Sequence, residues 1–157
     1  MNRFTAILLL AALPLFAGCA QKTADNATPG TDTTAKAPAA STVAATSAYD
    51  AGPRANATPA DLAKATLGEK LFATKGCTAC HAYGKKLTGP DLKGVTMRRT
   101  ALWMQHQIME PDVMTRTDPI SHQLMADNKN LQMLNLHLTQ DEALNLIEYF
   151  KKLDAAK

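Results

Sequence analysis

Residues 76–81 read Gly-Cys-Thr-Ala-Cys-His, and this stretch decides how the rest of the 157-residue chain is interpreted. Cys77 and Cys80 are separated by two residues, and His81 follows the second thiol directly. A thioredoxin-like redox pair has this thiol spacing but needs a flanking βαβ pattern, and the periodicity on both sides is helical. A structural zinc site needs a second ligand pair at zinc spacing, and the only other cysteine is Cys19.

The order Cys-x-x-Cys-His is the attachment signature of a c-type haem. The two thiols add to the two vinyl groups of one haem, and the two intervening residues hold the sulfurs at that separation. The histidine that follows is then placed under the iron. The sequence therefore predicts one covalent haem c per chain, bound through Cys77 and Cys80 and ligated by His81.

Two helix starts are visible after residue 57. Thr58, Pro59 and Asp61 fit an N-cap, a first-position proline and an acid three residues after the cap. Thr139 and Glu142 form a second capping-box pattern. Apolar residues follow both starts at helical spacing: Leu67, Gly68, Leu71 and Phe72 on the first helix, and Ala143, Leu146, Ile147, Phe150 and Leu153 on the last.

From residue 58 onward the chain resembles the small class I cytochromes c. In that family a glycine and an aromatic residue on the first helix pack against a leucine and a tyrosine on the last, and Gly68 with Phe72 and Leu146 with Tyr149 match that pattern. The resemblance implies an all-α fold, the class I cytochrome c fold, with three to five helices around one covalently bound haem.

Two further segments resemble parts of the family's haem site. Residues 88–92 resemble its Gly-Pro-x-Leu segment, whose proline carbonyl accepts a hydrogen bond from the proximal histidine; here these are Pro90 and His81. Such a contact orients the ring and raises its basicity as a ligand. Trp103, with Arg98 and Arg99 upstream, resembles the residues around the haem propionates.

The family's sixth iron ligand is a methionine in an extended loop before the last helix. Residues 133–142 follow the family's order of Met, Leu, Ser or Thr, and acids, so Met133 is the expected ligand and Met125 the alternative. The family usually has proline after the ligand, where this chain has Leu134. Three histidines compete for the position, namely His106, His122 and, most strongly, His137.

Methionine and histidine ligation leaves no open coordination position and raises the reduction potential relative to harder ligand pairs. The resemblance thus implies an electron carrier between respiratory donors and acceptors, not an enzyme. The alternatives are a haem sensor or enzyme with an open distal site, and a subunit of a larger respiratory complex. A net charge of +3 gives no reason to expect nucleic-acid binding.

Four lysines flank the haem motif and the Gly-Pro segment: Lys75, Lys85, Lys86 and Lys93. In related cytochromes a lysine ring around the exposed haem rim meets acidic redox partners, so the resemblance implies electrostatic docking here. The alternative is that these lysines are solvated and meet no partner.

The first 57 residues are predicted to serve export and anchoring. Residues 1–18 carry one positive charge and an apolar run too short to span a membrane, which is typical of a secretory signal. Residues 16–19 read Phe-Ala-Gly-Cys and resemble a bacterial lipobox, which implies lipidation of Cys19; the alternative is ordinary cleavage near Ala17. Ala20 is not the aspartate that marks inner-membrane retention, so we expect the periplasmic side of the outer membrane.

Residues 19–57 are predicted to form a lipidated cysteine and a flexible tether, because this Ala/Thr/Pro-rich stretch has too little apolar surface to offset the entropy of ordering it. As a random coil it would reach roughly 35 Å. Residues 58–157 remain as the cytochrome c domain.

Overall fold

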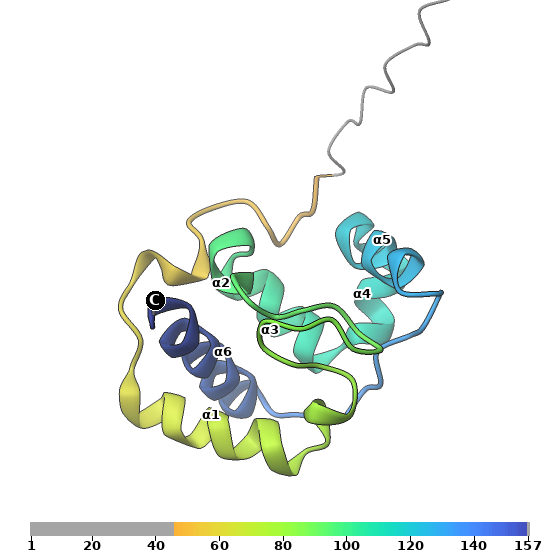
Figure 1. Ribbon diagram of the computed structural model, residues 1–157. Coiled ribbons are helices and arrows are strands. Elements are labelled where there is room, and N and C mark those ends of the chain that lie inside the picture. Colours follow the sequence, from red (N-terminus) through yellow and green to blue (C-terminus); the bar gives the residue numbers. More distant parts are fainter. Residues whose placement is uncertain (1–45, 157) are drawn as a thin grey trace, which may run out of the picture. The chain divides into compact units, whose positions relative to one another are not determined.

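The computed structural model describes residues 46–156, and every regular element in that range is helical. Two 3-10 turns, Ala55–Ala57 (η1) and Cys77–Ala79 (η2), accompany the α-helices. The α-helices are α1 (Leu62–Thr74), α2 (Val95–Arg98), α3 (Ala101–Met109), α4 (Pro111–Thr117), α5 (Pro119–Asp127) and α6 (Gln140–Ala155) (Figure 1). In this part of the chain, none of the helices combines the length and apolar character needed to cross a bilayer.

The predicted all-α fold is confirmed, and residues 46–156 contain six α-helices where three to five were expected. The additional elements are short. Pro111 and Pro119 each stand at the start of a new helix, since proline lacks the N–H group that would continue the preceding one. α2 is a single turn of four residues.

Helices α1 and α6 make the most extensive helix–helix contact in the described domain (Figure 1). Gly68 lets the two backbones approach, because a Cβ atom there would lie 2.0 Å from the Asn145 carbonyl oxygen. The rings of Phe72 and Tyr149 meet beside it, with centroids 5.8 Å apart. The predicted pairing of the first and last helices is therefore present.

Replacing Gly68 by alanine is expected to lower the free energy of unfolding of the holoprotein by about 3 kcal/mol, because overpacking forces two helix backbones apart. Denaturant unfolding followed by far-ultraviolet circular dichroism measures this. Thr66→Ala on the exposed face of the same helix is the control, with an expected change within about 0.5 kcal/mol. Equal unfolding midpoints for the two variants would contradict the close approach.

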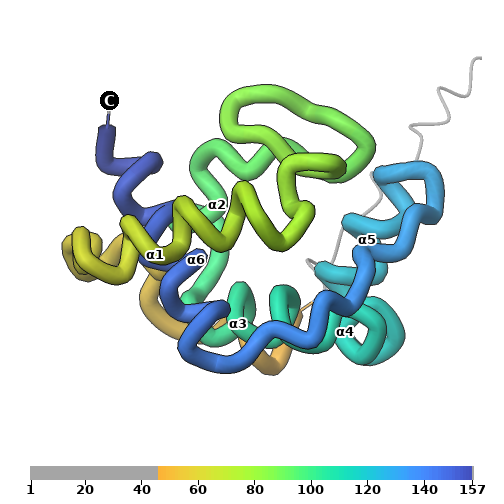
Figure 2. Tube along the Cα trace, turned by 90° about the horizontal axis from the view of Figure 1, so that it is seen from below, coloured from red at the N-terminus to blue at the C-terminus, as the bar shows by residue number. Residues whose placement is uncertain are grey.

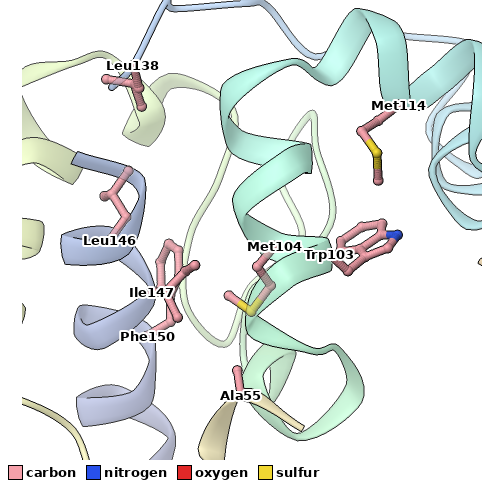
Figure 3. Close-up of a cluster of buried hydrophobic side chains, with 8 residues drawn as sticks. All are labelled: Ala55, Trp103, Met104, Met114, Leu138, Leu146, Ile147 and Phe150. Carbon is pink, nitrogen blue, oxygen red and sulfur yellow. The ribbon is translucent and has the colours of Figure 1, made fainter. Parts of the chain in front are cut away.

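The buried face of α6 packs against α3. Ile147 and Phe150 point toward Met104 of α3, whereas the Trp103 ring points away from α6 toward Met114 of α4 (Figure 3). Leu146 belongs to the same buried cluster. The predicted apolar face of α6 is confirmed. On α1 the prediction was partly wrong, because Leu67 is 54% exposed. Successive residues lie about 100° apart around a helix, so Leu67 lies away from the stripe that contains Gly68.

The two helix starts differ in outcome. The capping box of α6 is confirmed, since the Thr139 hydroxyl and the Glu142 carboxylate each accept a backbone N–H from the other residue. α1 begins later than predicted, with Asp61 in place of Thr58 as its N-cap. The Asp61 carboxylate accepts from two backbone N–H groups, whereas the Thr58 hydroxyl accepts from Lys151 Nζ at 3.0 Å.

Residues 46–57, here called the N-terminal strap, already pack on the domain, so the expected tether boundary at residue 57 lies too late in the chain. The Asp50 carboxylate accepts from Arg54, from Arg99 and from the Thr100 backbone N–H. The centroids of the Tyr49 and His106 rings lie 4.0 Å apart. Tyr49 and Asp50 thus hold the N-terminal strap on the domain, although the average composition of this stretch predicted disorder. The signal peptide, Cys19 and the rest of the tether lie outside the described residues.

Candidate haem site

A cavity of about 370 Å³ lies inside the domain, and all six α-helices contribute to its lining. Figure 2 shows the arrangement of these helices and of the segments that connect them. Residues far apart in the sequence meet here. The lining includes every residue predicted for the haem site: Cys77, Cys80, His81, Pro90, Trp103 and Met133.

One wall is formed by the turn that carries the two thiols. Gly76 has a φ of 83°, a left-handed conformation that glycine adopts without strain. The η2 turn follows, and the His81 backbone N–H donates to the Cys77 carbonyl at 2.9 Å. Both cysteines are half-buried free thiols. Burial raises the pKa of the Cys77 thiol, partly offset by a backbone hydrogen bond.

The His81 ring is held in one orientation. Its Nδ1 lies 3.1 Å from the Pro90 carbonyl oxygen. Because a carbonyl only accepts, Nδ1 carries the proton and the Nε2 lone pair is left for a metal. A Cβ atom at Gly89 would lie 2.6 Å from His81 Cε1, so the loop passes the ring only with glycine there.

A buried carboxylate near the end of α6 fastens the loop that carries Pro90. Asp154 accepts from the backbone N–H groups of Gly94 and Thr96, from the Thr96 hydroxyl and from the Tyr83 hydroxyl. Burial opposes its ionisation, but these hydrogen bonds outweigh burial and lower the pKa of Asp154. Burial, followed by the bond to Asp154, raises the pKa of Tyr83 to about 12. The sequence analysis did not predict this hydrogen-bond network around Asp154, because no local sequence pattern indicates it.

Met133 lines the cavity from the segment between α5 and α6. Its sulfur receives a hydrogen bond from Gln107 Nε2 on α3, at 3.7 Å. Met125 of α5 and the buried Met104 of α3 also line the cavity. Gln107 gave no signal in the sequence, because a single glutamine inside a helix is usually a surface residue.

The three competing histidines do not line the cavity. His106 Nδ1 is paired with Glu110. His122 Nδ1 donates to the Thr115 carbonyl at 3.3 Å. His137 is exposed and has a left-handed backbone, with a φ of 52°. These positions do not support a second histidine ligand.

The expectation that Trp103 lies beside the haem propionates stays a prediction. The Trp103 ring lines the cavity, but its indole N–H donates to the buried Asp118 carboxylate at 3.0 Å. That donor is therefore already used. Arg98 and Arg99 also line the cavity. Arg99 already pairs with the Asp50 carboxylate, and Arg98 donates to the Lys93 carbonyl. The Arg99 guanidinium stacks 5.1 Å from the centre of the Trp103 ring.

The residues present fit a covalently attached haem. A largely apolar cavity is lined by two free thiols, an imidazole whose Nδ1 is bonded to the Pro90 carbonyl, and a thioether. The structure gives no such support to a thioredoxin-like redox pair or to a structural zinc site. Residues 46–156 contain no strand for a βαβ pattern, and they bring together no group of three His, Cys, Asp or Glu side chains able to hold a metal ion.

Known proteins match this domain in sequence and structure. Cytochrome c-551 of Azotobacter vinelandii is 58% identical over 31 residues, which cover 20% of this chain and 38% of that relative. The solved cytochrome c from Rhodothermus marinus is 31% identical with a TM-score of 0.59, covering 62% of this chain and 82% of its own. An engineered Rhodothermus marinus cytochrome c, described as bound to a carbene intermediate, is 32% identical with a TM-score of 0.54, covering 60% and 80%.

The chain spans well under half the length of that cytochrome c-551, whereas the match to the family described as Cytochrome c covers residues 65–154, most of the folded domain. That range includes both thiols, the proximal histidine and the segment of Met133. The chain therefore belongs to the cytochrome c family, whose members carry covalently bound haem c.

Proposed function

We propose that this protein is a single-electron carrier in which one haem c is attached to Cys77 and Cys80, with His81 and Met133 as axial ligands of its iron. The observation that carries the proposal is one cavity lined by both thiols, by an imidazole fixed on the Pro90 carbonyl, and by the Met133 thioether. The bound haem supplies the one-electron chemistry. Two protein ligands leave no position for a substrate, which favours a carrier over an enzyme.

A spectroscopic redox titration of the purified holoprotein tests the proposal. We expect one reversible one-electron transition between low-spin oxidised and reduced forms. High-spin iron in either form would favour the alternative, a haem sensor or enzyme. Stoichiometric co-purification with a large partner would instead identify a subunit of a respiratory complex.

The proposal includes docking of an acidic redox partner at the segment that carries the haem motif. Three lysines are exposed there, namely Lys85, Lys86 and Lys93. Lys75 instead forms an ion pair with Glu142, with its Nζ 2.9 Å from the carboxylate Oε1. Complementary charge mainly speeds association and makes it sensitive to salt. The three exposed lysines are therefore the better candidates.

Reversing Lys85 and Lys86 to glutamate is expected to slow electron exchange with the native partner about tenfold at low salt, with little effect at high salt and none on the spectrum. Stopped-flow kinetics at two ionic strengths measures this. Reversing Lys64 and Lys70 on the exposed face of α1 is the control of equal charge change. Equal rates for both double variants would show that docking uses another face.

The anchor is proposed from the sequence: Cys19 is lipidated and holds the domain on the periplasmic side of the outer membrane. Because the N-terminal strap packs on the domain, residues 20–45 remain as the tether, with a random-coil reach of roughly 28 Å. We expect the intact mass of the mature protein to show a diacylated Cys19 at its start, and Cys19→Ser to give a soluble or uncleaved form. An unmodified Cys19 in the mature wild type would contradict lipidation.

A further inference from the structure

The segment that carries Met133 lacks the proline that usually makes it more rigid in this family. Residues 131–139 have no regular secondary structure, and Leu134 stands where the family usually has proline. A proline would fix one backbone torsion and reduce the freedom of the segment. In this chain the segment must be held by other means.

On one side of Met133, the Gln132 amide reaches into α4. Gln132 Nε2 donates to the Thr115 hydroxyl at 2.9 Å and to the Pro111 carbonyl at 3.1 Å. The Thr115 hydroxyl in turn donates to the Pro111 carbonyl at 2.7 Å. Thr115 and Pro111 are buried, so this amide is tied to a rigid part of the domain.

On the other side, the Asn135 amide is used at both ends. Its Nδ2 donates to the Asp112 carboxylate at 3.1 Å, and its Oδ1 accepts from the His137 backbone N–H at 2.9 Å. The hydrogen bond from Asn135 is the main cause that lowers the pKa of Asp112. The bond from the His137 backbone N–H to Asn135 Oδ1 supports the left-handed backbone of His137, which is uncommon for a residue other than glycine.

Both contacts run to the same helix. α4 is itself well anchored, because Pro111 begins it and Met114 is 1% exposed in the core. α4 also packs against α5 and α3. The segment around Met133 is thus fastened to one fixed helix on both sides of the sulfur-bearing residue.

We propose that Gln132 and Asn135 are positioning residues that fasten the Met133 segment to α4, in place of the missing proline, and thereby set how readily the Met133 sulfur leaves the iron. This inference rests on the proposed role of Met133 as an axial ligand. For the sulfur to move away, the segment has to shift, and both amide contacts oppose that shift.

Binding of imidazole to the oxidised holoprotein tests the inference, because imidazole occupies the iron only after the sulfur has left. A hydrogen bond contributes about 1 kcal/mol. Gln132→Ala and Asn135→Ala are therefore each expected to raise the affinity for imidazole about fivefold, and the double variant about 25-fold. The far-red absorption band of iron–methionine ligation should persist in all of them without imidazole.

Two comparisons separate positioning from a general loss of stability. Gln123→Ala removes an amide that bonds Asp127 on the exposed side of α5, and it should leave imidazole affinity unchanged. Asp112→Asn keeps an acceptor for Asn135 and should resemble wild type, whereas Asp112→Ala should resemble Asn135→Ala. If the Gln132 variants do not fold, the Asp112 pair decides.

Two failures are distinguishable. If Met133→Ala leaves the far-red band intact, the proposed ligand is wrong and this inference falls with it. If Met133→Ala removes the band but wild-type imidazole affinity is retained in the Asn135 and Asp112 variants, Met133 is the ligand and the fastening role is overturned.

Discussion

Cys77→Ala or Cys80→Ala is expected to leave little stable holoprotein, because each thiol forms one of the two thioether bonds to the haem. Loss of the haem would empty a cavity of about 370 Å³. At about 24 cal/mol per Å³ this costs on the order of 10 kcal/mol, which is comparable to the whole stability of a typical domain. The expected result is a protein that is degraded or only partly folded.

Denaturing gels stained for haem and total protein give the measurement. Cys19→Ala is the matched control, since it removes the third cysteine and should leave the haem stain unchanged. Covalent haem in the double variant Cys77→Ala/Cys80→Ala would end the thioether assignment.

Met133→Ala is expected to open the iron while the haem stays attached, because Cys77, Cys80 and His81 are untouched. The far-red band should disappear, and carbon monoxide should bind the ferrous form. The reduction potential should fall by on the order of 0.1 V, since the thioether ligand is what raises it. Absorption spectroscopy and redox titration of the same sample measure all three effects.

Met125→Ala is the control, because Met125 also lines the cavity and is the alternative ligand. It should keep the band, exclude carbon monoxide and leave the potential near that of wild type. If Met125→Ala removes the band and Met133→Ala does not, the iron is ligated from α5 and the sequence register of the distal loop is wrong.

Local patterns predicted the parts of the fold and the candidate site that depend on neighbours in the sequence. The capping box at Thr139 and the apolar face of α6 were both correctly predicted, because each depends on residues three or four apart. The two thiols and His81 lie within one turn of the chain, and Gly89 and Pro90 follow soon after. Their spacing alone was enough to indicate which group they hold.

Contacts across the fold could not be predicted in the same way. Gln107 on α3 donates a hydrogen bond to the sulfur of Met133, which lies 26 positions later in the sequence. The Asp154 carboxylate accepts hydrogen bonds from Tyr83 and Thr96, which lie far from it in the sequence. The strap was mistaken for tether because averaged composition hides the anchoring by Tyr49 and Asp50. Thr58 was predicted as the N-cap of α1, but Asp61 caps the helix instead. The Thr58 hydroxyl accepts from Lys151 Nζ of the last helix, a long-range contact that no local pattern predicts.

The absorption spectrum of the oxidised wild-type protein at neutral pH, followed by exposure of the reduced form to carbon monoxide, shows whether both axial positions of the iron are held by the protein. A closed site with His81 and Met133 on the iron predicts the weak far-red band of iron–methionine ligation and no carbon monoxide complex. An oxidised spectrum without that band, together with rapid carbon monoxide binding, would show an open distal position and contradict the assignment as an electron carrier.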